Sequence, residues 1–400
     1  MASKDVEVPP PSASGTTSTE NATTSSSSIS TATTATAPST ALSIPASAAN
    51  QSSSGANLTS STEGGSTTFA SRSSLFTSPI KYSSLKKEGE YLHDFRDGDK
   101  TLMNYVNHVG AMNVFDIFLD YTRVITQDSK QSAAAFYKEE NASLNRYNDI
   151  RYYIHANYVD GYREEKKYIL TQAPLEATFE RFWEMVWKEN STMIVALTPL
   201  DGEKCPIYLP IGSGQSKEYG AIKVVNMGTR HIRDVYDATL LMITKDGSPI
   251  RTILHIIFFS WPDKETPIRP TEIIHFIDDI NFNRNILMKN AQNKGWLTEG
   301  KTTKSPIIIH CKAGVGRSGA LAAIDICSRK LDDTFKRGSP AVDVRDTVLR
   351  LRTQREMAVQ KPEQYLFIHL SVYEYAVRKR YFESIEDVHL DLFVNRKPKK

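Results

Sequence analysis

The sequence has few cysteines, no long apolar run and almost no aromatic side chains over its first 80 residues. Three cysteines in 400 residues are too few, and odd in number, for a disulfide framework. There is no Cys-x2-Cys pair and no His-Glu-x-x-His sequence, so no metal site is expected. No run of about 18 apolar residues occurs, so no membrane span is expected either. These absences favour a reduced, cytoplasmic protein.

Residues 1–80 differ in composition from the rest of the chain. They are mainly Ser, Thr and Ala, and Phe69 and Phe76 are their only aromatic residues. Their net charge is −2, which leaves +5 on the remainder of a chain whose total is +3. A segment this poor in large apolar groups cannot offset the entropy of ordering, so we predict a disordered tail. The first ten residues also lack the apolar core of a signal peptide.

The remaining chain divides into residues 81–385, predicted to form one domain, and a basic tail at 386–400. The lead-in at 82–140 has apolar residues at helical spacing and is predicted to be mostly helical. The tail ends in Arg-Lys-Pro-Lys-Lys, for which a solvated role is favoured over acidic-lipid binding or a nuclear address. No nucleic-acid partner is expected, and the oligomeric state is left open.

The most informative segment is His-Cys-Lys-Ala-Gly-Val-Gly-Arg-Ser-Gly at residues 310–319. An apolar run at 306–309 precedes it and predicts a buried strand, and apolar residues at helical spacing follow it. A loop that opens a helix is an anion site, because its N–H groups are free and the positive end of the helix dipole faces the ligand. Such a site pushes a cysteine toward the thiolate. Arg317 adds a planar fork that fits phosphate oxygens.

The other two cysteines serve as a control for this spacing. The sixth residue after Cys205 is Ile211, and the sixth after Cys327 is Asp333, so Cys311 alone is followed by arginine at that distance. The alternative is a buried structural cysteine, a common role for an isolated thiol. The glycines and the arginine around Cys311 favour instead a loop that holds a phosphate against a nucleophilic sulfur.

Residues 310–319 resemble the signature loop of the classical, non-receptor-type protein tyrosine phosphatases. The resemblance implies an α/β fold with a twisted mixed β-sheet flanked by helices, and no cofactor. It implies that Cys311 attacks phosphorus and forms a cysteinyl-phosphate, that Arg317 binds the phosphate, and that His310 helps set the thiolate pKa. Ser318 would help the thiolate to leave. The phosphate-binding backbone would be that of Lys312, Ala313, Gly314, Val315 and Gly316. The family usually has Ser where this chain has Lys312.

Trp261-Pro262-Asp263 follows a strand-like run at 255–259 and lies 48 residues before Cys311. Alone, this tripeptide could be a turn with a solvated carboxylate. Together with the cysteine loop it resembles the movable acid loop of the family. The resemblance implies that Asp263 is the general acid and then the general base, and that Trp261 belongs to the hinge. Glu265 stands where relatives commonly have glycine.

Three further segments resemble substrate-binding blocks of the same family. Tyr147 would stack on the substrate ring and Asp149 would accept hydrogen bonds from the substrate backbone, although the link at 150–153 is shorter than usual. Lys204, in a block where Leu209 replaces Trp, would steady the acid loop. Gln360 would position the hydrolytic water and Gln364 would support it, just before a predicted helix at 362–383. Trp183 and Trp187 are expected to be core residues.

The implied partners are phosphotyrosine-containing proteins, and the predicted reaction is their dephosphorylation. One alternative is a pseudophosphatase that binds phosphotyrosine with weak turnover, which the short link, Glu265 and Leu209 favour. Cys311, Arg317, Asp263 and Gln360 favour the enzyme. A second alternative is activity on phosphoserine or phosphoinositide, which the positive charge of Lys312 favours.

Overall fold

The computed structural model describes residues 91–94, 100–126, 137–146, 156–203, 205–261, 266–267, 269–298 and 305–381. All of them belong to one compact unit that spans Ser74–Lys400. The predicted tails at 1–80 and 386–400 lie outside the described residues, as does the short link at 150–153.

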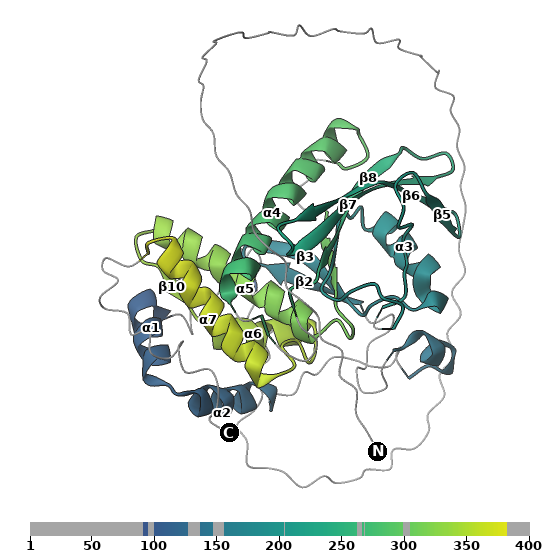
Figure 1. Ribbon diagram of the computed structural model, residues 1–400. Coiled ribbons are helices and arrows are strands. Elements are labelled where there is room, and N and C mark those ends of the chain that lie inside the picture. Colours follow the sequence, from purple (N-terminus) through teal and green to yellow (C-terminus); the bar gives the residue numbers. More distant parts are fainter. Residues whose placement is uncertain are drawn as a thin grey trace, which may run out of the picture. The chain divides into compact units, whose positions relative to one another are not determined.

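A twisted eight-stranded mixed sheet lies at the centre of the unit (Figure 1). The strand order is β2-β3-β9-β4-β8-β7-β6-β5. Strands β3, β9, β4 and β8 run parallel to one another, and the strands outside them pair antiparallel. The bounds are β2 (Ala156–Gly161), β3 (Glu164–Thr171), β4 (Met193–Ala196), β5 (Ser216–Tyr219), β6 (Ile222–Ile232), β7 (Tyr236–Lys245), β8 (Arg251–Phe258) and β9 (Ile307–His310). The predicted fold class is therefore confirmed.

Strand β9 explains why the run at 306–309 is wholly apolar. All four of its residues are buried. Ile307 and Ile309 belong to a hydrophobic core on one face of the sheet, and Ile308 belongs to a second core on the other face. A parallel strand covered on both faces has no polar side, so it lacks the alternation of a half-exposed strand.

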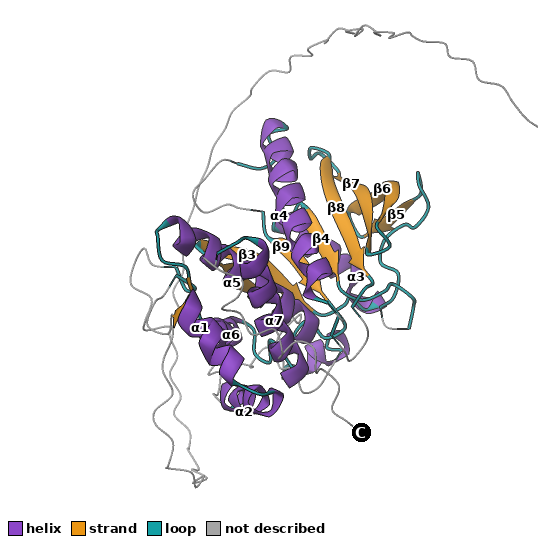
Figure 2. Cartoon of the chain, turned by 60° about the vertical axis from the view of Figure 1, so that its left-hand side comes forward, coloured by secondary structure: helices purple, strands orange, loops and turns teal. Residues whose placement is uncertain are grey.

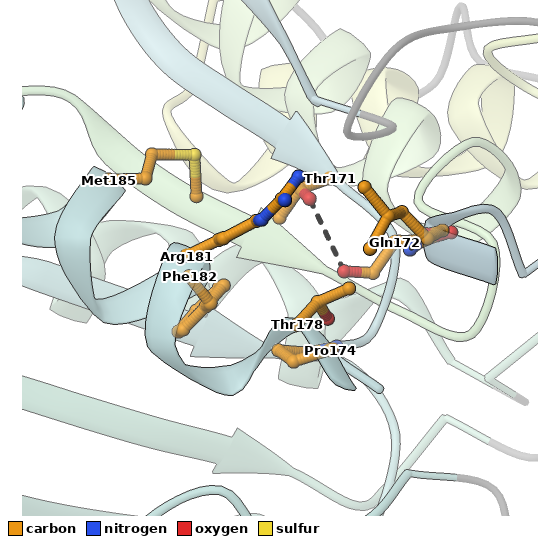
Figure 3. Close-up of a pocket in the computed structure, with 8 residues that line it drawn as sticks. Thr171, Gln172, Pro174, Thr178, Arg181, Phe182 and Met185 are labelled. Atoms are coloured by element: carbon orange, nitrogen blue, oxygen red, sulfur yellow. Dashed lines mark hydrogen bonds between the residues drawn. The ribbon is translucent and has the colours of Figure 1, made fainter. Parts of the chain in front are cut away.

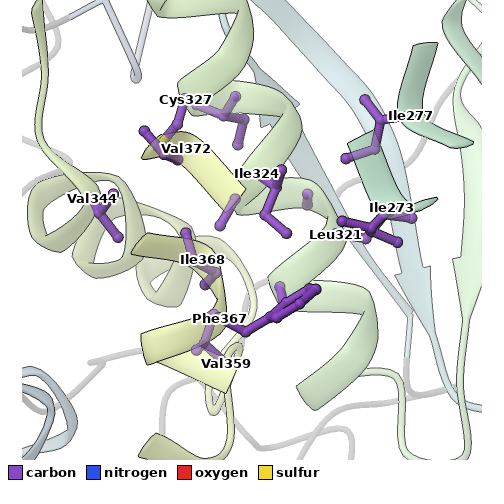
Figure 4. Packing of buried hydrophobic residues seen from close by; sticks show 14 of the residues in the cluster. Ile273, Ile277, Leu321, Ile324, Cys327, Val344, Val359, Phe367, Ile368 and Val372 are labelled. Atoms are coloured by element: carbon purple, nitrogen blue, oxygen red, sulfur yellow. The ribbon is translucent and has the colours of Figure 1, made fainter. Parts of the chain in front are cut away.

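Helices cover both faces of the sheet (Figure 2). On one face α3 (Phe179–Lys188) carries Trp183 and Trp187 into the second core, as predicted. The larger core on the other face contains residues of the remaining α-helices, and part of it is drawn in Figure 4. These helices are α1 (Leu102–Ala111), α2 (Val114–Ile125), α4 (Pro270–Asn293), α5 (Gly316–Lys336), α6 (Val344–Gln354) and α7 (Pro362–Arg378).

The described part of the lead-in contains the helices α1 and α2. Helix α2 starts with a capping box between Asn113 and Asp116. Strand β1 (Lys100–Thr101) pairs with β10 (Ala341–Val342), which attaches the lead-in to the segment between α5 and α6. Residues 139–144 form a short 3-10 helix, η2 (Glu139–Leu144).

The predicted helix at 362–383 is wrong at its carboxyl end, because α7 ends at Arg378. Arg380 adopts a φ of 55°, and the Tyr381 N–H donates to the Ala376 carbonyl at 3.0 Å. Such a left-handed residue with a back-bonded N–H closes a helix, and a sequence without glycine there gives no signal of it. None of the helices in the described ranges is long and apolar enough to cross a membrane.

Candidate active site

Cys311 lies where the central parallel strands end. His310, the last residue of β9, is in register with Thr171 of β3 and Ala196 of β4. Helix α5 begins five residues after Cys311, at Gly316. The carboxyl ends of parallel strands and a helix N-terminus therefore meet at this sulfur, the place where open α/β sheets bind ligands.

The Cys311 thiol is surrounded by groups that favour its anion. Its Sγ accepts a hydrogen bond from the Gly314 N–H at 3.2 Å. Burial, the largest influence, opposes the thiolate, because only 4% of the residue is exposed. The charge of Arg317, the polar groups of Ser318 and the hydrogen bond from the Gly314 N–H outweigh burial and lower the pKa of Cys311. The Ser318 hydroxyl is buried and has no hydrogen-bond partner among the described residues, so it acts on the sulfur as a nearby dipole.

The Arg317 side chain is only 7% exposed and spans two strand ends. Its Nη1 donates to the Leu197 carbonyl, just after β4, at 2.7 Å. The same nitrogen lies 3.4 Å from the Trp261 carbonyl, just after β8. Trp261 is itself buried and packs edge-on against Phe367 of α7 at 5.6 Å between ring centroids. The start of the predicted acid loop is thus tied directly to Arg317, the predicted phosphate-binding residue.

The loop backbone leaves no room for a side chain at Gly314. Its φ is +70°, and a Cβ there would lie 2.0 Å from the Thr171 carbonyl oxygen. The Ala173 N–H donates to the Lys312 carbonyl at 3.1 Å. Glycine is therefore required for the turn that brings the loop against the end of β3.

Arg355 fixes the same loop from the other side, and no role for it was predicted from the sequence. Its guanidinium is fully buried and donates to the carbonyls of Gly314, at 3.0 Å, and Ala313, at 3.2 Å. It also donates to Asn157 Oδ1 at 2.6 Å. With these carbonyls bound to Arg355, the loop can offer its N–H groups to an anion. Its closeness in sequence to Gln360 was the one signal that pointed to the site, although it did not indicate these contacts.

His310 is the end of a buried chain of three aromatic side chains. Its Nδ1 lies 3.3 Å from the Cys311 carbonyl, and its Nε2 lies 2.6 Å from the Tyr208 hydroxyl. The same hydroxyl lies 2.6 Å from His255 Nε2. Burial is the main reason why the pKa of His310 is lowered to about 4 and that of His255 to about 3. Both imidazoles are therefore neutral at pH 7.

The donors and acceptors present determine which atom donates in each of these hydrogen bonds. A carbonyl only accepts, so His310 Nδ1 carries the proton and Nε2 accepts from the Tyr208 hydroxyl. The Tyr208 oxygen then accepts from His255 Nε2–H. His255 Nδ1 remains as an acceptor without a described partner. In the opposite direction, His255 Nδ1 would carry a buried proton without a described acceptor. The lone pair of His310 Nδ1 would also point at a lone pair of the Cys311 carbonyl oxygen. That direction is therefore disfavoured.

The two predicted glutamines are brought together beside the signature loop. Gln364 Oε1 accepts from the Gln360 N–H at 3.0 Å and from the Lys361 N–H at 3.2 Å. The Gln364 amide also packs on Gly316, where a Cβ would lie 2.8 Å from its Nε2. Gln360 itself is exposed. Gln364 is thus bonded to the backbone that carries Gln360, and the roles predicted for both side chains stay predictions.

Four predicted site residues lie outside the described residues: Asp263, Tyr147, Asp149 and Lys204. Their predicted roles stay predictions. Arg146, directly before Tyr147, is described, and its guanidinium donates to the carbonyls of Ala173 and Pro174 at 3.1 and 3.2 Å. This contact places the residue before Tyr147 against the segment that follows β3.

Figure 3 shows a small pocket between the end of β3 and α3. None of the predicted site residues lines it. Its lining residues are Leu144, Thr171, Gln172, Pro174, Thr178, Arg181, Phe182 and Met185. Across the described ranges, no group of three or more His, Cys, Asp or Glu residues is placed to hold a metal ion.

Comparison with known proteins agrees with this geometry. The family described as Protein-tyrosine phosphatase matches residues 117–374. The chain belongs to the protein-tyrosine phosphatase family, and the membership predicted from the signature loop is confirmed.

Named relatives in several organisms share this likeness. "Tyrosine-protein phosphatase non-receptor type 9" of Homo sapiens is 28% identical over 300 residues, which are 70% of this chain and 49% of that protein. "Tyrosine-protein phosphatase non-receptor type 5" of Homo sapiens is 36% identical over 227 residues, 56% of this chain and 36% of that protein. "Probable tyrosine phosphatase protein N1" of Microplitis demolitor bracovirus is 34% identical over 259 residues, 59% of this chain and 76% of that protein. The chain thus spans about half, or less, of the two human relatives.

Proposed function

We propose that this protein hydrolyses phosphotyrosine in proteins through a cysteinyl-phosphate intermediate. The observation that carries the proposal is the Cys311 sulfur, with its lowered pKa, in a loop that opens α5 beside Arg317. A thiolate in that position is a nucleophile facing a site for a dianion. Because the reducing cytoplasm preserves a free thiolate, we propose that location for the activity.

In the first step, the Cys311 thiolate attacks phosphorus. The S–P bond forms as the bond from phosphorus to the tyrosyl oxygen breaks, and Asp263 gives its proton to that oxygen. Arg317 and the loop N–H groups balance the charge on the equatorial oxygens.

In the second step, a water molecule held by Gln360 attacks phosphorus. The S–P bond breaks, inorganic phosphate forms, and Asp263 takes the proton from the water. Cys311 leaves as a thiolate, which is a good leaving group here because Arg317, Ser318 and the Gly314 N–H favour its anion.

The test is hydrolysis of a phosphotyrosine peptide by the full chain, with peptide binding recorded in parallel. Cys311→Ser should abolish turnover and keep binding, and Asp263→Ala should lower kcat by about 10²–10⁴-fold, the usual contribution of a general acid. Turnover that survives in Cys311→Ser would contradict the mechanism. Binding without turnover in the unmutated protein would instead identify a phosphotyrosine-binding pseudophosphatase.

A phosphothreonine peptide of the same sequence is the control for substrate class. Equal rates on both peptides would contradict the preference for phosphotyrosine and favour the alternative substrates that Lys312 suggests.

A further inference from the structure

Val359, the residue before Gln360, has an unfavourable backbone conformation. Its φ is +61°, the left-handed region, although it is β-branched and fully buried. Such a conformation is strained for a β-branched residue and persists only where neighbouring contacts enforce it. The segment that carries Gln360 therefore depends on whatever holds Val359 in place.

Hydrogen bonds hold both backbone groups of Val359. Its N–H donates to the Val315 carbonyl of the signature loop at 3.1 Å. Its carbonyl accepts from the Tyr121 hydroxyl of α2 at 3.0 Å. Gly319 permits this approach, because a Cβ there would lie 2.6 Å from the Val359 nitrogen. The lead-in helix α2 and the signature loop are thus both hydrogen-bonded to Val359.

The Tyr121 contact also fixes the peptide unit that enters Gln360. The Val359 carbonyl and the Gln360 N–H belong to one planar peptide group. Tyr121 holds its oxygen, and Gln364 Oε1 accepts from its N–H at 3.0 Å. With both ends of the plane held, the position of the Gln360 Cα is fixed. The Lys361 N–H bond to the same Gln364 oxygen, at 3.2 Å, restricts the backbone rotation that would turn the Gln360 side chain.

Tyr121 is well placed for this task. It is 4% exposed, and its ring packs against Tyr365 of α7 at 5.7 Å between centroids. Burial raises the pKa of Tyr121 to about 12, so the hydroxyl remains a donor at any working pH. Its loss would leave the Val359 carbonyl buried without that partner, which favours relaxation of the loop.

We propose that Tyr121 is a positioning residue for the hydrolysis step, acting on the Gln360 side chain through the Val359–Gln360 peptide. This inference rests on the proposed function, because it assigns the water-directing role to Gln360. It separates the two steps: Tyr121 supports breakage of the S–P bond by water and has no part in its formation.

The experiment is rapid mixing of the full chain with p-nitrophenyl phosphate, comparing Tyr121→Phe with the unmutated protein. The burst of p-nitrophenol reports the first step, and the steady rate then reports hydrolysis. In Tyr121→Phe the burst rate constant should stay unchanged while the steady rate falls about tenfold, the effect of one lost buried hydrogen bond. Acid-quenched phosphoenzyme should accumulate in proportion.

Tyr105→Phe is the matched control. Tyr105 is a buried tyrosine of α1, and its hydroxyl lies 2.8 Å from His369 Nδ1 of α7 rather than bonding the Val359 carbonyl. The Tyr105→Phe variant should lose about as much thermal stability as Tyr121→Phe. It should leave the ratio between the burst rate and the steady rate unchanged. Equal slowing of both steps in Tyr121→Phe, or a ratio of steps like that of Tyr105→Phe, would overturn the inference and leave the proposed function intact. Absence of burst and turnover in the unmutated protein would overturn both.

Discussion

Cys311 and Cys205 are both buried thiols in loops, yet their surroundings have opposite effects. Burial raises the pKa of Cys205 to about 12, and its Sγ lies 3.4 Å from the Pro206 carbonyl, which favours the thiol. Cys311 is almost as buried, but the charge of Arg317, Ser318 and the Gly314 N–H lower its pKa. The comparison teaches that burial by itself raises the pKa of a thiol, and that donors and a cation beside the sulfur can outweigh burial and lower it.

Arg317→Met should have the largest effect on this difference between the pKa values of the two cysteines. Without the guanidinium, burial should dominate and the pKa of Cys311 should rise toward that of an ordinary thiol. If Arg317 binds the phosphate as proposed, kcat/KM for p-nitrophenyl phosphate should fall about 10³–10⁵-fold, the contribution of transition-state arginines in other phosphoryl-transfer enzymes. The rate of iodoacetamide alkylation at pH 6 should fall too, because the sulfur would be protonated there.

Arg284→Met is the matched control for Arg317→Met. Arg284 is an equally buried arginine that also donates to a backbone carbonyl, that of Ser305, at 2.6 Å. It should leave the alkylation rate of Cys311 unchanged. An unchanged rate in Arg317→Met as well would show that the helix N-terminus alone sustains the thiolate.

The neutral histidines behind Cys311 predict acid sensitivity. The pKa of His310 is lowered from 6.5 to about 4, so between these values the unfolded chain binds a proton that the folded chain does not. Stability is therefore fully present above pH 6.5 and is lost as the pH falls toward 4, by on the order of 3 kcal/mol for this residue. Urea unfolding between pH 7 and 4 measures it. His255→Asn, which removes the second buried imidazole, should reduce the loss, and a midpoint independent of pH would contradict the prediction.

Tyr208 connects the surroundings of the two cysteines. Of the predicted changes, Tyr208→Phe should have the smallest effect, which is a loss of stability. The residue lies three positions after Cys205, and its hydroxyl reaches His310. The change removes the hydroxyl partner of both His255 and His310, which should cost about 1–3 kcal/mol. Tyr236→Phe, which removes a more exposed hydroxyl bond to Asp279, should cost less. Equal costs in a thermal melt would contradict the chain of hydrogen bonds.

The signature loop could be predicted because its signals are local. The strand β9, Cys311, Arg317 and the start of α5 follow one another within a short stretch of sequence, and their types and spacing define the chemistry. The contacts of Arg355 and Tyr208 could not be predicted in this way. Arg355 reaches Gly314 across 41 positions and Tyr208 reaches His310 across 102. Which carbonyl or imidazole a buried donor meets is decided by packing, which residue spacing does not encode.

Successive residues of β9 face two different cores, so the number of residues in this strand is critical. Ile307 and Ile309 face one core while Ile308 faces the other. Loss or gain of one codon in this strand would exchange the faces of every side chain beyond it and displace Cys311 by about 3.3 Å along the sheet. Substitutions among Ile, Val and Leu would cost far less. In genetic variation of this protein, small insertions and deletions at β9 should therefore be much rarer than missense changes.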